Sequence, residues 1–216
     1  GIRDYYASRG LGDVYKRQNE DSNQSYKTAT SGLPDSSNKT YSFYWGEYGT
    51  DQTGITNYDK VDGSNDFGFL KPEQDSYKGT PYLPDDVSSW TNGALSDWDG
   101  KANSNVLKGV TTGGGSYTSY ATAGHVLNTF LASADAKGYD DWYIPSCGQL
   151  SLIYMYLISV NNALLAIGGQ PLDTRYYWSS SEHSSDSVWI VLFNNGRTFT
   201  RYKRLTSSVR FVRDIE

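Results

Sequence analysis

The side chains best suited to covalent chemistry are few and stand far apart in the sequence. The one cysteine, Cys147, falls in the first turn of a predicted helix, where the helix dipole favours the thiolate. A cysteine nucleophile also needs a base, and neither His125 nor His183 is near it in sequence. The pattern therefore predicts a small buried side chain at Cys147 rather than a catalytic residue.

The acidic residues raise the question of a calcium site or of paired catalytic carboxylates. They come together at Asp85-Asp86 and at Asp97 and Asp99, without the spacing of a twelve-residue calcium loop. We expect these residues to serve turns and helix caps. Lysozyme-like hydrolysis needs two carboxylates, or a nucleophile and its base, in one pocket. No spacing in the chain indicates such a pair, so we expect no enzymatic activity, metal or cofactor; a hydrolase is the alternative.

The composition is typical of a loop-rich globular protein with aromatic anchors. The chain has 216 residues, is 37% hydrophobic and contains 19 Tyr, 6 Trp and 22 Gly. Its net charge of −5 does not favour nucleic acid as a partner. One cysteine permits no internal disulfide, and no run of about 18 apolar residues predicts a membrane span.

Three segments differ in composition. Residues 1–18 end in SRGLGDVYKRQ, which resembles translated sequencing-adapter read-through; a disordered natural terminus is the alternative. This segment lacks the apolar region of a signal peptide, and a missing natural amino terminus also fits it. Residues 19–40 are rich in Ser, Asn, Lys and Asp and are predicted to form a linker. Residues 41–216 are predicted to form a single domain.

The spacing of apolar residues predicts two helices. The first covers about residues 120–136, and the second runs from about residue 147 to 167, after Ser146 as its cap. Residues 46–105 are dominated by Gly, Asp, Asn, Ser and Pro and are predicted to form long loops pinned by buried aromatic side chains. A short aromatic strand is predicted at residues 41–45.

The last forty residues predict a sheet of short strands around the turn Asn194-Asn195-Gly196. Strand alternation places Trp189 and Phe193 on one face and Ile190 and Leu192 on the other. A strand that is apolar on both faces is either buried on both or presents one face to a partner. The strand-like runs are residues 188–193, 197–203 and 209–212.

Motifs in a fixed order resemble an uncharacterised domain family of bacterial surface lipoproteins and phage tail proteins that is similar to C-type lectins. The match covers about residues 95–213. The motifs are Ser96–Asn103, Asp141–Ser146, Gly148–Leu150, Gly168-Gly169, Tyr177–Glu182, Val188-Trp189, Phe193–Gly196 and Val209–Arg213. The resemblance implies an α+β, C-type lectin-like fold with two helices packed on short antiparallel β-sheets and long loops.

Two relatives of that fold have chemistry that this chain lacks. Sugar-binding C-type lectins use disulfides and a calcium-binding loop of the Glu-Pro-Asn type, and formylglycine-generating enzymes need a redox pair of cysteines. The chain has one cysteine and no such loop. Neither calcium-dependent sugar binding nor that enzymatic activity is therefore implied.

The C-terminal segment resembles the variable proteins of diversity-generating retroelements, in which asparagine codons of a template are mutagenised at adenines to retarget binding. The implied fixed frame is Trp178, Ser179, Ser180, Glu182, Trp189, Phe193, Asn194, Asn195, Gly196, Val209, Arg210, Val212 and Arg213. The implied ligand-binding positions contain only residue types that adenine changes in AAC or AAT codons can reach. They are His183, Ser184, Ser185, Asp186, Ser187, Ile190, Leu192, Phe199, Thr200, Arg201, Tyr202, Arg204, Leu205, Thr206, Ser207 and Ser208.

The resemblance implies a ligand- or receptor-binding protein on a bacterial cell surface or phage particle, with a protein or glycan of a target cell as its partner. A non-diversifying adhesin or a pilus or envelope domain of the same fold is the alternative. Residues 197–213 contain six cations and no acid, so we expect an anionic patch on the partner. Of these cations, Arg210 and Arg213 are predicted to be structural ion-pair partners.

Overall fold

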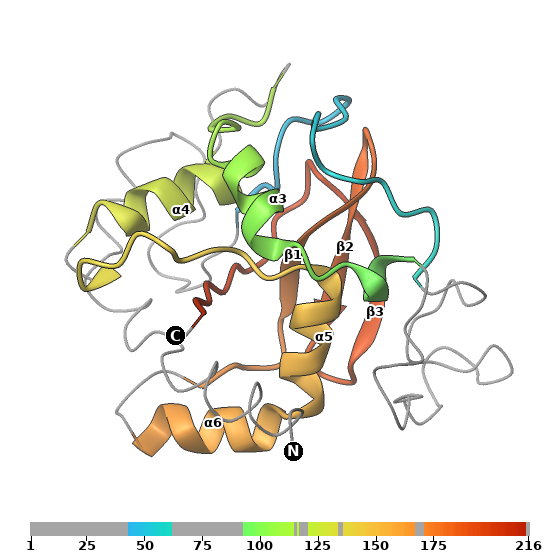
Figure 1. Cartoon of the computed structure of the whole chain (residues 1–216). Coiled ribbons are helices and arrows are strands. Elements are labelled where there is room, and N and C mark those ends of the chain that lie inside the picture. The colour runs from blue at the N-terminus through green and yellow to red at the C-terminus, as the bar shows by residue number, and fades with distance from the viewer. Residues whose placement is uncertain are drawn as a thin grey trace, which may run out of the picture.

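The computed structural model describes residues 43–61, 93–114, 116, 121–133, 136–166 and 171–214 (Figure 1). The predicted adapter-derived segment, the predicted linker and Asp85-Asp86 lie outside the described residues. The helical elements are η2 (Ala94–Ser96), α3 (Gly100–Leu107), α4 (Ala123–Leu131), α5 (Cys147–Met155) and α6 (Leu157–Ala166). The strands are β1 (Tyr176–Ser184), β2 (Ser187–Leu192) and β3 (Arg197–Tyr202). The predicted α+β class is confirmed.

The three strands form one antiparallel sheet in the order β1-β2-β3. Ile190 on the central strand lies opposite Trp178 on β1 and Phe199 on β3. After β3 the chain returns to the opposite edge of the sheet, beside β1. There the carbonyl oxygen of Ser208 accepts a hydrogen bond from the N–H of Trp178 at 2.9 Å. Residues 209–212 were predicted as a strand, but only Val212 forms a bridge, with Tyr143.

The first predicted helix is shorter than expected, and the second is two helices. Apolar spacing predicts one helix over residues 147–167, whereas α5 ends at Met155 and α6 continues at an angle of 79°. The bend brings Val160 and Leu164 of α6 into the same apolar cluster as Leu172. The side chain of Asn161 fixes this arrangement, because it accepts from the N–H of Leu172 and donates to its carbonyl oxygen.

Helix α3 begins inside the stretch predicted to be loops, residues 46–105, so that prediction is wrong for residues 100–105. Asp97 precedes the helix and is buried; its carboxylate accepts from the N–H of Asp99, from Asn103 Nδ2 and from Ser181 Oγ. The predicted turn role of Asp97 is confirmed. A Cβ at Gly100 would meet Gln149 Oε1 at 2.2 Å, so this helix packs closely on the start of α5.

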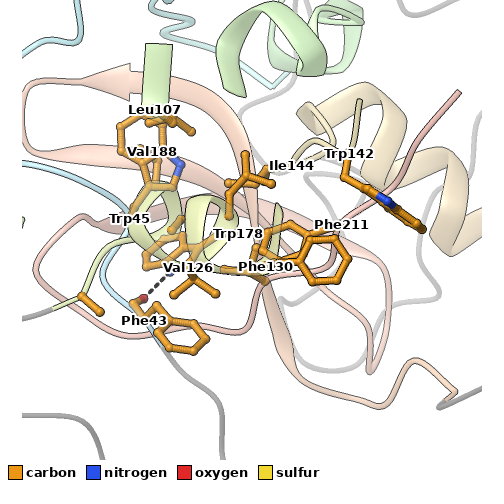
Figure 2. Packing of buried hydrophobic residues seen from close by; sticks show 14 of the residues in the cluster. Phe43, Trp45, Leu107, Val126, Phe130, Trp142, Ile144, Trp178, Val188 and Phe211 are labelled. Carbon is orange, nitrogen blue, oxygen red and sulfur yellow. Dashed lines mark hydrogen bonds between the residues drawn. The ribbon is translucent and has the colours of Figure 1, made fainter. Parts of the chain in front are cut away.

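Tryptophan side chains attach residues 43–61 to the sheet. The indole Nε1–H of Trp178 donates to the carbonyl of Phe43 at 2.6 Å (Figure 2). Trp189 likewise donates to the carbonyl of Tyr58 at 2.8 Å, and in the reverse direction Trp45 donates to the carbonyl of Ser179 at 2.7 Å. Because each indole is buried, each bond satisfies a donor that would otherwise cost about 1–3 kcal/mol. The sheet is thereby fixed in place by residues more than a hundred positions away.

Candidate ligand-binding surface

Strand β2 is buried on both faces, which settles the alternative left open by its sequence. On one face Trp189 and Val191 pack into clusters with residues of α5 and α6. On the other face Val188 and Ile190 join the cluster around Trp178 shown in Figure 2. Trp189 is 2% exposed, as predicted for the fixed frame, and Phe193 is buried as well.

The prediction that Ile190 faces out is wrong, because its side chain is 0% exposed. The physical reason is that its face of the sheet packs into the apolar cluster that also contains Phe43 and Trp45, which come from a distant part of the chain. Within the sheet, Ile190 lies opposite Trp178 on β1 and Phe199 on β3. The ring of Phe199 also meets that of Tyr176 edge to face, at 5.9 Å between centroids. A ligand cannot contact Ile190 in this structure.

Three serines among the predicted ligand-binding positions are also buried: Ser187, Ser207 and Ser208. Ser187 Oγ lies 2.9 Å from His183 Nδ1 and 3.0 Å from Ser184 Oγ. The backbones of Ser207 and Ser208 pair with Phe43 and with β1. Their roles in holding the frame were not visible in the sequence, because serine is common in loops and in strands alike.

The remaining predicted positions keep some accessible surface. Tyr202 is 50% exposed, Leu205 is 41% exposed and Arg204 is exposed. The half-buried positions are His183, Ser184, Ser185, Asp186, Leu192, Phe199, Thr200, Arg201 and Thr206. The accessible set therefore lies at the end of β1 and on the turn to β2, at the end of β2, on β3 and on the residues that follow β3.

On the sheet face, four side chains form a row that we call the sheet-face row: Arg201, Tyr176, Phe199 and Arg197. Arg201 Cζ lies 4.9 Å from the centroid of the Tyr176 ring, and Arg197 Cζ lies 5.1 Å from that of Phe199. The two rings are in edge-to-face contact with each other. Each cation therefore lies over one ring, in a geometry that favours cation–π attraction.

A second group, the turn cluster, gathers Tyr48, Tyr202, Arg204 and Leu205. Arg204 Cζ lies 5.2 Å from the ring centroid of Tyr48 and 5.1 Å from that of Tyr202. The N–H of Leu205 donates to the carbonyl of Tyr202, which closes the turn after β3. Exposed tyrosine, arginine and leucine side chains in one place are typical of protein-binding surfaces.

Local sequence patterns did not indicate that Tyr48 and Tyr176 belong to this surface. Tyr48 lies far from the C-terminal segment, and only the folded chain brings it beside Arg204. Tyr176 begins β1, which was recognised as a motif but not predicted as a strand. The alternation rule would have placed Tyr176 on the same face as Trp178, had the strand been predicted.

The predicted group of six cations is only partly on the surface. Arg213 forms an ion pair with Asp141 at 3.0 Å, which confirms its structural role. Arg210 is buried. Burial lowers the pKa of its guanidinium group, and the nearby Tyr177 and Asp173 act in the opposite direction and raise that pKa. Lys203 is also buried, so its expected contribution to an exposed cationic patch is wrong. Arg197, Arg201 and Arg204 remain as surface cations.

Lys203 forms a buried ion pair with Glu182. Its ammonium group also donates to the carbonyl of Thr50 at 2.6 Å and lies 5.1 Å from the ring centroid of Trp45. The carboxylate of Glu182 accepts from the N–H of Gln52 at 3.0 Å. Burial lowers the pKa of Lys203 and raises that of Glu182, while each partner opposes the shift of the other. The pair therefore connects the end of β3 to β1 and to residues 50–52.

Cys147 is fully buried, which confirms its interpretation as a small interior side chain. Burial raises the pKa of its thiol far above the usual range, and the charge of Asp97 raises it further. We therefore expect native protein to react with iodoacetamide at least about tenfold more slowly than an exposed thiol, because little thiolate forms. Mass spectrometry in buffer and in guanidinium chloride measures this. Rapid alkylation of the native protein at pH 8 would contradict it.

Among the described residues, no three His, Cys, Asp or Glu side chains come together as a metal site would require. No single described helix is long and apolar enough to cross a membrane; α5 and α6 pass by length and composition only as a bent pair.

Comparison with known proteins places the larger part of the chain in one family. The family model described as the Lcl C-terminal domain matches residues 89–213, which include α3 to α6, the sheet and the accessible surface after it. The comparison with curated proteins gave no match. In general terms the family match supports a lectin-like surface or binding protein. The chain belongs to the Lcl C-terminal domain family.

Proposed function

We propose that this protein is a non-enzymatic ligand- or receptor-binding module that displays a hypervariable surface within residues 183–208 on a C-type lectin-like scaffold. It acts on a bacterial cell surface or a phage particle and binds a protein or glycan of a target cell. The proposal also covers diversification by a retroelement, as the resemblance of the C-terminal segment implies.

The observation that carries the proposal is the contrast between the buried and the exposed side chains of the C-terminal segment. Trp178, Trp189 and Phe193 are buried, and the two indoles donate hydrogen bonds to residues 43–61. Tyr202 and Leu205 expose large side chains, and Arg204 stacks on the Tyr202 ring. Exposed apolar groups of this size are costly in a free protein, and a bound partner removes that cost.

The test is the double variant Y202A/L205A, stained against a panel of intact bacterial cells by flow cytometry. We expect the apparent dissociation constant for the stained cells to rise at least about tenfold, as loss of two interface anchors predicts. The thermal midpoint should change little, because both side chains are exposed. The matched control is Ile158→Ala on α6, which removes an 80% exposed apolar side chain away from the sheet. Equal binding by Y202A/L205A and the native protein would refute the proposed surface.

A non-diversifying adhesin or envelope domain is the second candidate. Burial of Ser187, Ile190, Ser207 and Ser208 favours it, because fewer positions are free to change than the resemblance implies. Sequencing the genomic neighbourhood separates the two. A reverse transcriptase gene and a near-identical template repeat rich in AAC codons support retargeting, and their absence from a complete locus supports the static domain.

A further inference from the structure

The sheet-face row contains two guanidinium groups that no carboxylate of the described residues neutralises. Among the residues that the structure describes, neither Arg197 nor Arg201 forms an ion pair. Arg201 donates one hydrogen bond, to the carbonyl of Thr206 at 3.3 Å. The backbone N–H of Arg197 donates to Asn195 Oδ1, but no hydrogen bond from its guanidinium is present. This differs from the other cations of the segment, such as Arg213 and Lys203, which have acidic partners.

Both groups are partly removed from water. The Nε–H groups of Arg197 and Arg201 are buried and have no hydrogen-bond partner. Burial also lowers the pKa of Arg201. Stacking on the rings of Phe199 and Tyr176 offsets part of this cost but leaves the terminal N–H groups without an anion. A partly desolvated cation of this kind gains most from an added carboxylate, which forms short charge-assisted hydrogen bonds.

The order of groups along the row restricts the chemistry of the partner. Arg201 lies at one end and Arg197 at the other, and the two rings lie between them, with successive separations of 4.9, 5.9 and 5.1 Å. A ligand that covers the whole row must bring an anion to each end and an apolar group to the middle. An extended peptide with acidic residues at positions i and i+4 and an apolar residue at i+2 presents all three on one side.

We propose that the sheet-face row binds an acidic segment of a protein, with two carboxylates flanking one apolar side chain. The proposal rests on the proposed binding function and names the class of partner for that surface. Tyr176 becomes a binding residue although it lies outside residues 183–208. A sulfated polysaccharide would also match the cations, and the C–H face of a sugar can stack on an aromatic ring. The apolar centre formed by Tyr176 and Phe199 is matched more fully by an aliphatic side chain than by a sugar ring bordered by hydroxyl groups, so a protein is favoured.

The test uses short immobilised peptides and the full chain in biolayer interferometry. The probe contains Glu-Ser-Leu-Ser-Glu, and the comparison peptides contain Gln-Ser-Leu-Ser-Gln and Glu-Ser-Ser-Ser-Glu. We expect the probe to bind, and each comparison peptide to bind at least about tenfold more weakly, because one loses both anions and the other loses the apolar contact. Binding should weaken as salt rises.

The variants R197Q and R201Q should each weaken binding of the probe about tenfold, and together they should abolish it. Arg175→Gln is the matched control, because Arg175 is already paired with Asp173 at 2.6 Å; it should leave binding unchanged. Equal binding of the Glu and Gln peptides, or no binding of either, would overturn the proposal. Binding of a sulfated oligosaccharide with the same arginine dependence, and no preference among the peptides, would overturn it in favour of a glycan.

The outcomes separate this inference from the proposed function. If R197Q/R201Q still stains cells while Y202A/L205A does not, the surface binds its target without the acidic-segment chemistry, and only the inference fails. If Y202A/L205A stains cells like the native protein, the proposed function fails.

Discussion

Replacing Lys203 by Met is expected to lower the free energy of unfolding by about 3–5 kcal/mol, because it leaves a buried carboxylate without its cation. Glu182 is buried and has its pKa raised by desolvation, so the loss of Lys203 would favour protonation of Glu182 or water entry. The ammonium group also holds the carbonyl of Thr50 and lies over Trp45, and these contacts disappear with it. Urea unfolding followed by tryptophan fluorescence measures the change.

The double variant E182Q/K203M separates charge from packing. With both charges removed, no uncompensated ion is left in the interior, and the amide of Gln can still accept from the N–H of Gln52. We expect the double variant to recover at least half of the stability lost in the single variant. If K203M unfolds at the same urea concentration as the native protein, the ion pair does not hold the frame as the structure indicates.

Ile190→Ala is expected to cost about 2–5 kcal/mol, the range for truncating a fully buried aliphatic side chain. The side chain lies between Trp178 and Phe199 and packs in the cluster that contains Phe43 and Trp45, so a cavity left there has rigid aromatic walls and cannot easily collapse. Leu205→Ala is the matched comparison, because it removes an aliphatic side chain that is 41% exposed. Its cost should stay below about 1 kcal/mol.

Ile190→Val refines the comparison, since it keeps the β-branched shape and should cost only about 0.5–1.5 kcal/mol. The same denaturant series measures all three variants. If Leu205→Ala destabilises the protein more than Ile190→Ala does, then Leu205 belongs to the buried frame and Ile190 does not, contrary to the structure.

The parts of the fold that were predictable carry strong local signals. Alternating β-branched and aromatic residues predicted β2 and β3 with small errors at their ends, and Asn194-Asn195-Gly196 predicted the turn between them. Strand β1 has Ser179, Ser180 and Ser181 at its centre, and a serine run has no apolar alternation to detect. The bend between α5 and α6 follows from tertiary packing on Leu172, which no periodicity within the helices records.

The position of the candidate site in the chain could be predicted, but which of its residues are buried could not. Its place after β2 followed from the C-terminal pattern, and the exposure of Tyr202 and Leu205 was expected. Alternation places Ile190 and Leu192 on one face, but it does not say what lies over that face. Phe43 and Trp45, far away in the sequence, pack in the same cluster as Ile190, and Lys203 is buried in an ion pair with Glu182 on β1. Long-range contacts of this kind cannot be derived from local spacing.

The central claim is that a buried aromatic frame leaves the surface on β3 and after it free to change. Two libraries displayed on yeast test it most directly: one randomises Tyr202, Arg204 and Leu205, and the other randomises Ser187, Ile190 and Ser207. The measurement is the fraction of variants that resist protease and so remain folded. We predict that most members of the first library and few of the second survive. Equal survival, or better survival of the second library, would contradict the claim.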